Sequence, residues 1–219
     1  MKEDFAKARK IMVDNQIRPV GVTNYALLDS LGKIPREKFV PENRVSLSYC
    51  DSDHKLSESG RYLMSPASFA RLAQLADVKQ NEIILLVGCG TGYSVAVLSG
   101  LCSAVFGIED DEELVKKAES VLADLNIGNS AVLTKDLSKG VPSEAPFDLI
   151  LIEGEVDSVP SALLSQLRDG GRLVAVIKDG AIGKASVFVK SGKDVSQRIG
   201  FDVKIPSLSL GQDRAQFAL

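Results

Sequence analysis

Three glycines follow a short apolar run near the middle of the chain. Residues 83–87 are all apolar, and Gly88, Gly90 and Gly92 come directly after them. Such a run is typical of a strand buried on both faces. Glycine has no Cβ, so a turn built from it bends tightly and lets a ligand lie on backbone N–H groups. With a helical pattern beginning near Val95, the stretch predicts the opening of a nucleotide-binding unit.

An acidic residue follows at the place where such units hold a ribose. Residues 104–108 predict the next strand, and Glu109 ends it, about 20 residues after the first glycine. A carboxylate can accept hydrogen bonds from both ribose hydroxyls and repels a 2′-phosphate. Tyr93 stands where a dinucleotide fingerprint has its third glycine, so no pyrophosphate contact is indicated. The spacing favours a nucleoside-type cofactor over the alternative of a simple tight turn.

Alternating helical and strand patterns flank this unit. Apolar residues at helical spacing predict helices over residues 4–15, 25–31, 66–76, 111–125 and 160–167. Ile11 and Ala26 are expected to face the core from the first two. Apolar runs predict strands over residues 131–133, 147–152 and 172–177, followed by an antiparallel pair near 186–190 and 198–203. Residues 46–63 have no clear period and predict a flexible loop lying on the sheet.

This alternation predicts an α/β fold with a doubly wound, mostly parallel Rossmann-like sheet, an antiparallel C-terminal edge and an N-terminal helical extension. We expect one domain, with residues 1–65 as the extension and residues 66–219 as the cofactor-binding core. Ligands bind outside the carboxyl ends of the strands in such sheets.

That rule places the glycine turn, Glu109, Asp136 and Glu153 along one rim of the sheet. Asp136 either meets an adenine amino group or is a solvated turn acid. Glu153 and Glu155 are expected to be solvated.

Composition limits the classes of function. The chain has 219 residues, 45% of them hydrophobic and 25% charged, with a net charge of −3. The acidic balance argues against general nucleic-acid binding. No apolar run is long enough for a membrane span, and the N-terminus lacks a signal-peptide core. Three cysteines in no metal-binding pattern indicate a reduced, cytoplasmic protein with buried thiols. His54 is the sole histidine, so no metal site and no histidine-based triad is predicted.

The residues around the glycine turn resemble a known motif. Residues 86–93 are similar to the first motif of class I S-adenosylmethionine-dependent methyltransferases. More specifically, the chain resembles the protein-L-isoaspartate O-methyltransferases. The resemblance is carried by Val40-Pro41, by Gly88-x-Gly90-x-Gly92-Tyr93, by Pro146-Phe147-Asp148, and by the Gln-Leu to Gly-Gly spacing within residues 160–174. It covers most of residues 5–178.

The resemblance implies a cofactor, a substrate and a reaction. Members of that family use S-adenosylmethionine to methylate the α-carboxylate of L-isoaspartyl residues, which begins the repair of damaged proteins. The implied partners are isoaspartyl-containing peptides or proteins, with no nucleic acid and no membrane. The enzyme mainly positions its substrates: a carboxylate oxygen must lie about 3 Å from the methyl group, in line with the methyl–sulfonium bond. The carboxylate is already ionised near neutral pH, so a histidine base is not required.

The substrate motif differs from the family pattern. Family members carry a serine two places before the proline that opens the helix preceding the glycine strand. Here Met64 stands in that place and Ser65 comes one place later, before Pro66. The resemblance implies Ser65 as the serine of the catalytic site. Ser65 is also suited to cap the helix, and the same helix start is suited to hold a carboxylate. On the functional interpretation, Ser65→Ala costs turnover more than stability.

Two alternatives from other classes stay open at this point. One is a cofactor-binding regulatory protein of the same fold that has lost isoaspartyl methylation, or a methyltransferase with a different substrate; the changed motif around Ser65 favours it. The other is an NAD-dependent oxidoreductase, which Tyr93 disfavours.

Overall fold

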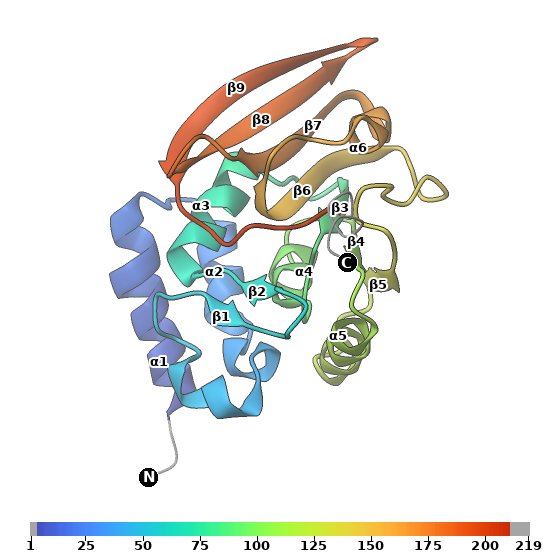
Figure 1. The fold of residues 1–219 in the computed structure, drawn as a ribbon. Helices are drawn as coiled ribbons and strands as arrows, with labels where there is room; N and C mark the ends of the chain where they lie inside the picture. Colours follow the sequence, from blue (N-terminus) through green and yellow to red (C-terminus); the bar gives the residue numbers. More distant parts are fainter. Residues whose placement is uncertain (1–3, 211–219) are drawn as a thin grey trace, which may run out of the picture.

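The structure, a computed structural model, describes residues 4–210 and has one large sheet at its centre (Figure 1). In the described part, seven strands lie in the order β5-β4-β3-β6-β7-β8-β9. Their bounds are β3 (Ile83–Val87), β4 (Ala104–Glu109), β5 (Ser130–Thr134), β6 (Phe147–Val156), β7 (Leu167–Ile177), β8 (Gly183–Ser191) and β9 (Asp194–Val203). The strands from β5 to β7 pair in parallel, whereas β8 and β9 pair antiparallel. The predicted fold class is confirmed.

Helices cover the two faces of this sheet unequally. They are α1 (Phe5–Met12), α2 (Tyr25–Lys33), α3 (Pro66–Ala76), α4 (Tyr93–Ser99), α5 (Glu112–Asp124) and α6 (Ser161–Ser165). A π-helical turn (Val13–Ile17) and a 3-10 turn (Arg18–Val20) prolong α1, and two further 3-10 helices span Arg36–Phe39 and Glu42–Leu47. The helices α1 to α5 pack on one face through a shared apolar cluster, and α6 packs on the other face.

The alternation of side chains along β3 shows how the sheet separates two cores. Ile84 and Leu86 join the cluster with the helices α1 to α5, while Leu85 and Val87 join the cluster with α6. Period-two alternation sends neighbouring side chains to opposite faces of a sheet. Met12, from the N-terminal extension, belongs to the first cluster, so the extension packs on the same core as the glycine turn.

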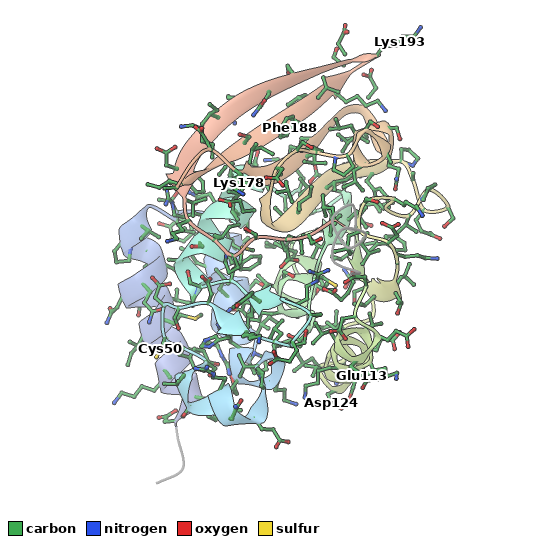
Figure 2. The ribbon with its side chains drawn as sticks, viewed as in Figure 1. Cys50, Glu113, Asp124, Lys178, Phe188 and Lys193 are labelled. Carbon is green, nitrogen blue, oxygen red and sulfur yellow. The ribbon has the colours of Figure 1, made fainter. Side chains whose placement is uncertain are left out.

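Several element boundaries and faces differ from the sequence-based expectation. Ile11 is 45% exposed and Ala26 is exposed, because the buried stripes of α1 and α2 fall on neighbouring residues. The strand β6 continues through Glu155, where it still pairs with Val176 of β7. Cys50 is exposed, so not every thiol is buried (Figure 2).

Residues 46–63 were expected as a loop without regular structure, but residues 54–63 within them form a hairpin. The strand β1 (His54–Lys55) pairs antiparallel with β2 (Tyr62–Leu63). We call residues 49–63 the covering segment, because they lie over the carboxyl end of the sheet. The buried Arg36 fixes both ends of this segment: its Nε donates to the Ser48 carbonyl at 2.8 Å and its Nη2 to the Met64 carbonyl at 2.6 Å.

Candidate functional site

The glycine turn lies where the chain connections of the sheet diverge. The strand β3 continues to β4 on one side, and β6 lies on the other side. Open α/β sheets bind ligands at such a switch point. Gly88, Gly90 and Gly92 have φ angles of 78°, 54° and 87°, a left-handed region in which residues with a Cβ are strained. The turn therefore depends on glycine, as its sequence predicts, and α4 begins directly after it.

Glu109 ends β4 beside this turn and is completely buried. Its Oε2 accepts a hydrogen bond from the Gly90 backbone N–H at 3.0 Å. Its Oε1 accepts from Arg61 Nε at 2.8 Å and from the backbone N–H groups of Asp110 and Asp111 at 2.9 and 3.3 Å. Burial raises the pKa of Glu109, and the Arg61 guanidinium opposes that rise. The structure thus brings the glycine turn and the predicted ribose acid into direct contact.

Glu153 corrects the expectation of a solvated acid. It lies within β6, is half-buried, and accepts a hydrogen bond from the Ser94 hydroxyl of α4. Burial raises its pKa to about 8, the Ser94 hydrogen bond lowers it, and the nearby Glu109 charge raises it further. A second carboxyl group, mostly protonated near neutral pH, therefore lies close to Glu109.

Asp136 lies in the loop after β5, at the same edge of the sheet, and its side chain is 41% exposed. Its Oδ1 accepts from the Ser138 backbone N–H at 2.9 Å and from the Ser138 hydroxyl at 2.6 Å, and Lys139 lies 3.1 Å from Oδ2. The Ser138 hydroxyl is the main reason that the pKa of Asp136 lies below its ordinary value. These contacts organise a turn, and a role toward adenine stays a prediction.

Ser65 caps α3. Its hydroxyl accepts a long hydrogen bond of 3.4 Å from the Ser68 backbone N–H. Two carboxylates of the covering segment already lie at this helix start: Asp53 accepts from the Ser65 N–H at 2.8 Å, and Asp51 accepts from the Ala67 N–H at 3.1 Å. The capping geometry is present, and a catalytic role for Ser65 stays a prediction.

Three residues near the turn were not found by sequence reasoning: Leu56, Arg61 and Leu208. Arg61 is 2% exposed and bonds Glu109 and Asp110. The carboxylates raise the pKa of Arg61 although its burial acts to lower it, so the guanidinium stays charged. These residues are distant in the chain from the turn and carry no local pattern that would have revealed them.

Comparison with known proteins identifies the family. The family described as protein-L-isoaspartate(D-aspartate) O-methyltransferase matches residues 7–207. The chain belongs to this family. It is 36% identical over 192 residues to protein-L-isoaspartate O-methyltransferase 1 of Syntrophobacter fumaroxidans, covering 87% of this chain and 88% of the relative. It is 38% identical over 172 residues to protein-L-isoaspartate O-methyltransferase 2 of Shewanella sediminis, covering 78% of this chain and 70% of the relative.

Solved structures of the family share the fold. A protein-L-isoaspartate O-methyltransferase structure superposes with a TM-score of 0.79 at 24% identity, over 93% of this chain and 65% of that chain. A Plasmodium falciparum protein of the same kind, solved with S-adenosyl-L-homocysteine, gives a TM-score of 0.77 at 22% identity, over 92% of this chain and 98% of that chain. Among residues 4–210, no helix has the length and apolar character needed to cross a bilayer.

The donor set fits S-adenosylmethionine, the cofactor of this family. The three glycines have no Cβ that would keep a ligand away from the backbone of the turn, and the Glu109 carboxylate accepts a hydrogen bond from the Gly90 N–H. Members of the family methylate isoaspartyl residues. As a member of this family, the protein is a protein-L-isoaspartate O-methyltransferase.

Proposed function

We propose that this protein transfers the methyl group of S-adenosylmethionine to the α-carboxylate of L-isoaspartyl residues in damaged proteins. The observation that carries the proposal is the contact between Glu109 and the Gly90 N–H, which joins the ribose acid to the glycine turn. The cofactor supplies a methyl group bonded to a positively charged sulfur. The backbone of residues 88–92 and the Glu109 carboxylate would hold it, with Asp136 toward the adenine.

The remaining work of the protein is to orient a carboxylate. We assign Ser65 to this task, because its hydroxyl lies at the start of α3, where a helix favours an anion. In the reaction one carboxylate oxygen bonds the methyl carbon while the carbon–sulfur bond breaks and its electron pair stays on sulfur. No proton moves, so the absence of a histidine base agrees with this chemistry.

The substrates that follow are isoaspartyl-containing peptides and proteins, and we place the protein in the cytoplasm as a single domain. Cys50, Cys89 and Cys102 are free thiols, which supports a reducing compartment. The net charge of −3 gives no reason to add a nucleic-acid partner.

A second candidate is a cofactor-binding regulatory protein without the methylation step. Met64, at the position of the family serine, is 4% exposed, so its side chain packs in the core. The family's serine contact is therefore not reproduced at that position, which is the observation favouring this candidate.

One assay separates the two candidates. The protein is incubated with labelled S-adenosylmethionine and an isoaspartyl peptide, beside the matching aspartyl peptide. We expect methyl incorporation into the isoaspartyl peptide only. Binding of S-adenosylhomocysteine without incorporation would support the regulatory candidate, and binding of NAD in its place would contradict both.

A further inference from the structure

Side chains of the protein itself fill the space above the glycine turn. A Cβ added to Gly90 would lie 2.6 Å from Leu56 Cδ1, and one added to Gly88 would lie 2.9 Å from Leu208 Cδ2. The cavity left between Arg61, Gly88, Glu153 and Leu208 is about 10 Å³. That volume suits about one water molecule and is far too small for a nucleoside.

Most of the acceptor capacity of Glu109 is also used, because Oε1 accepts three N–H groups and Oε2 accepts one. A carboxylate has about four lone-pair positions for hydrogen bonds. In the structure, four N–H groups point at Glu109: those of Gly90, Asp110 and Asp111, and the Nε of Arg61. The first three belong to the turn and to the residues after β4. Arg61 is the exception, since it reaches Glu109 from the covering segment, 48 residues away in the sequence.

The covering segment places complementary groups at both halves of the site. Arg61, a donor, lies on the acid expected to hold the ribose, and its Nη2 also donates to Asp110 at 2.5 Å. Asp51 and Asp53, acceptors, lie on N–H groups at the start of α3, where the substrate carboxylate is expected. The covering segment therefore places a donor where ribose hydroxyls would donate, and acceptors where a substrate carboxylate would accept.

The segment is held at its tip mostly by polar contacts. Ser59 Oγ donates to Asp111 at 2.8 Å and Arg61 donates to Glu109 and Asp110, whereas the bond from the Leu56 N–H to the Arg61 carbonyl, at 2.8 Å, lies within the hairpin. The side chain of Leu56 is partly buried, whereas Asp51 and Asp53 are exposed. Contacts of this kind can be exchanged for contacts with a ligand without opening the apolar core.

We propose that the covering segment is an internal ligand of the cofactor site, and that Arg61 must leave Glu109 before the cofactor ribose can bind there. The proposal rests on the proposed function and adds a means of regulation to it. The protein exchanges between this closed conformation and one in which the tip of the segment has moved away. Apparent cofactor affinity is then the intrinsic affinity reduced by the fraction of open protein.

The first test is calorimetric titration of S-adenosylhomocysteine into the parent protein, Arg61→Gln and Lys55→Gln. Lys55 lies in the same hairpin, in an exposed ion pair with Glu58 at 2.6 Å, and makes a matched control. We expect Arg61→Gln to bind at least about fivefold more tightly, because the closed state loses its main anchor, and Lys55→Gln to bind like the parent. Unchanged or weaker binding by Arg61→Gln would overturn the proposal.

The second test uses hydrogen exchange in the unmodified protein. Addition of S-adenosylhomocysteine should protect residues 88–92 and increase exchange in residues 54–63, because the ligand displaces the hairpin. A lid that closes over the ligand would instead become protected, and that result would overturn the proposal.

A further variant covers the possibility that Arg61→Gln fails to fold. Leu56→Ala keeps the Arg61–Glu109 pair and removes the side chain over Gly90, so it should also bind more tightly than the parent. If the parent binds S-adenosylhomocysteine and neither variant binds it more tightly, the internal ligand is wrong, while the cofactor site on which the proposed function depends is retained. If no variant binds it at all, the proposed function fails as well.

Discussion

The rim of the sheet and the covering segment meet at Glu109 but are built in different ways. Backbone bonds between strand ends hold the rim: the N–H groups of Gly88 and Cys89 donate to the Ile108 carbonyl at 2.9 and 3.2 Å. Side chains hold the covering segment, chiefly Arg36 at its base and Arg61 at its tip. A site with a rigid floor and a cover held by polar side chains can keep its shape while the cover moves.

Burial follows the same division. Ile84, Leu85, Leu86 and Val87 of β3 are completely buried, so the floor of the site belongs to the core. Most residues of the covering segment are exposed or half-buried. Changes at the rim should therefore alter ligand binding, whereas changes at the base of the cover should alter stability.

The largest effect on stability is expected at the base of the cover. Arg36→Met keeps the apolar stem but removes both hydrogen bonds to the Ser48 and Met64 carbonyls. Hydrogen bonds from a charged donor contribute roughly 1.5–3 kcal/mol each, so unfolding free energy should fall by at least about 3 kcal/mol. In a chain of this size the melting temperature falls by about 2–4 °C per kcal/mol.

The control for this change is Arg18→Met, which breaks an exposed ion pair with Asp14. Exposed pairs of this kind contribute only about 0.3–0.5 kcal/mol. Equal melting temperatures for the Arg36 and Arg18 variants would show that Arg36 does not anchor the segment.

At the rim, Gly90→Val should remove cofactor binding. The left-handed φ of 54° strains a β-branched residue by roughly 1–2 kcal/mol, and the added carbons enter the space beside the turn. Gly128→Val is the matched control, because nothing lies within 4 Å of a Cβ at Gly128 and its φ is not positive. S-adenosylhomocysteine titration should show binding by the control and none by Gly90→Val; parent-like binding by a folded Gly90→Val would contradict the site.

Sequence reasoning found the rim because its signals are local. An apolar run, three spaced glycines and an acid at a fixed distance specify strand, turn and ligand in one stretch of chain. The covering segment could not be predicted in this way, because its contacts join residues far apart in the sequence. Arg61 and Glu109 are 48 residues apart, and Arg36 and Met64 are 28 residues apart. Glu153 was misjudged for the same reason: its partner Ser94 is 59 residues away.

Glu153 is expected to make the stability of the folded protein fall as pH rises. Its pKa rises from 4.5 to about 8 on folding, so the folded protein binds the proton more tightly and loses stability as pH rises between these values. Glu153→Gln removes this loss. Its melting temperature should match the parent near pH 4, below the unfolded pKa, and exceed it near pH 8.5 by at least about 2 °C, the shift for about 1 kcal/mol.

The exposed Glu113→Gln, on α5, provides the comparison (Figure 2). Its melting temperature should follow the parent at both pH values. If the melting temperature of Glu153→Gln does not rise relative to the parent between the acid and the alkaline buffer, Glu153 does not have the raised pKa that its place beside Glu109 predicts.

The smallest stability effect is expected at Ser65. The capping hydrogen bond to Ser68 is long, at 3.4 Å, so Ser65→Ala should lower stability by less than about 1 kcal/mol while turnover on an isoaspartyl peptide falls. Asn24→Ala, which removes the cap of α2, should lower the melting temperature alone. Normal turnover in Ser65→Ala would assign Ser65 to capping and place the substrate carboxylate elsewhere.

If Arg61 and the cofactor ribose share Glu109, then Glu109 must hold the ribose once Arg61 has been removed. The most direct measurement compares S-adenosylhomocysteine affinity in Arg61→Gln with that in the double variant Arg61→Gln/Glu109→Gln, where the internal competitor is absent from both. Charge-assisted hydrogen bonds contribute roughly 1.5–3 kcal/mol each, so the double variant should bind at least about tenfold more weakly. Equal affinities would remove Glu109 from the cofactor site and contradict the account.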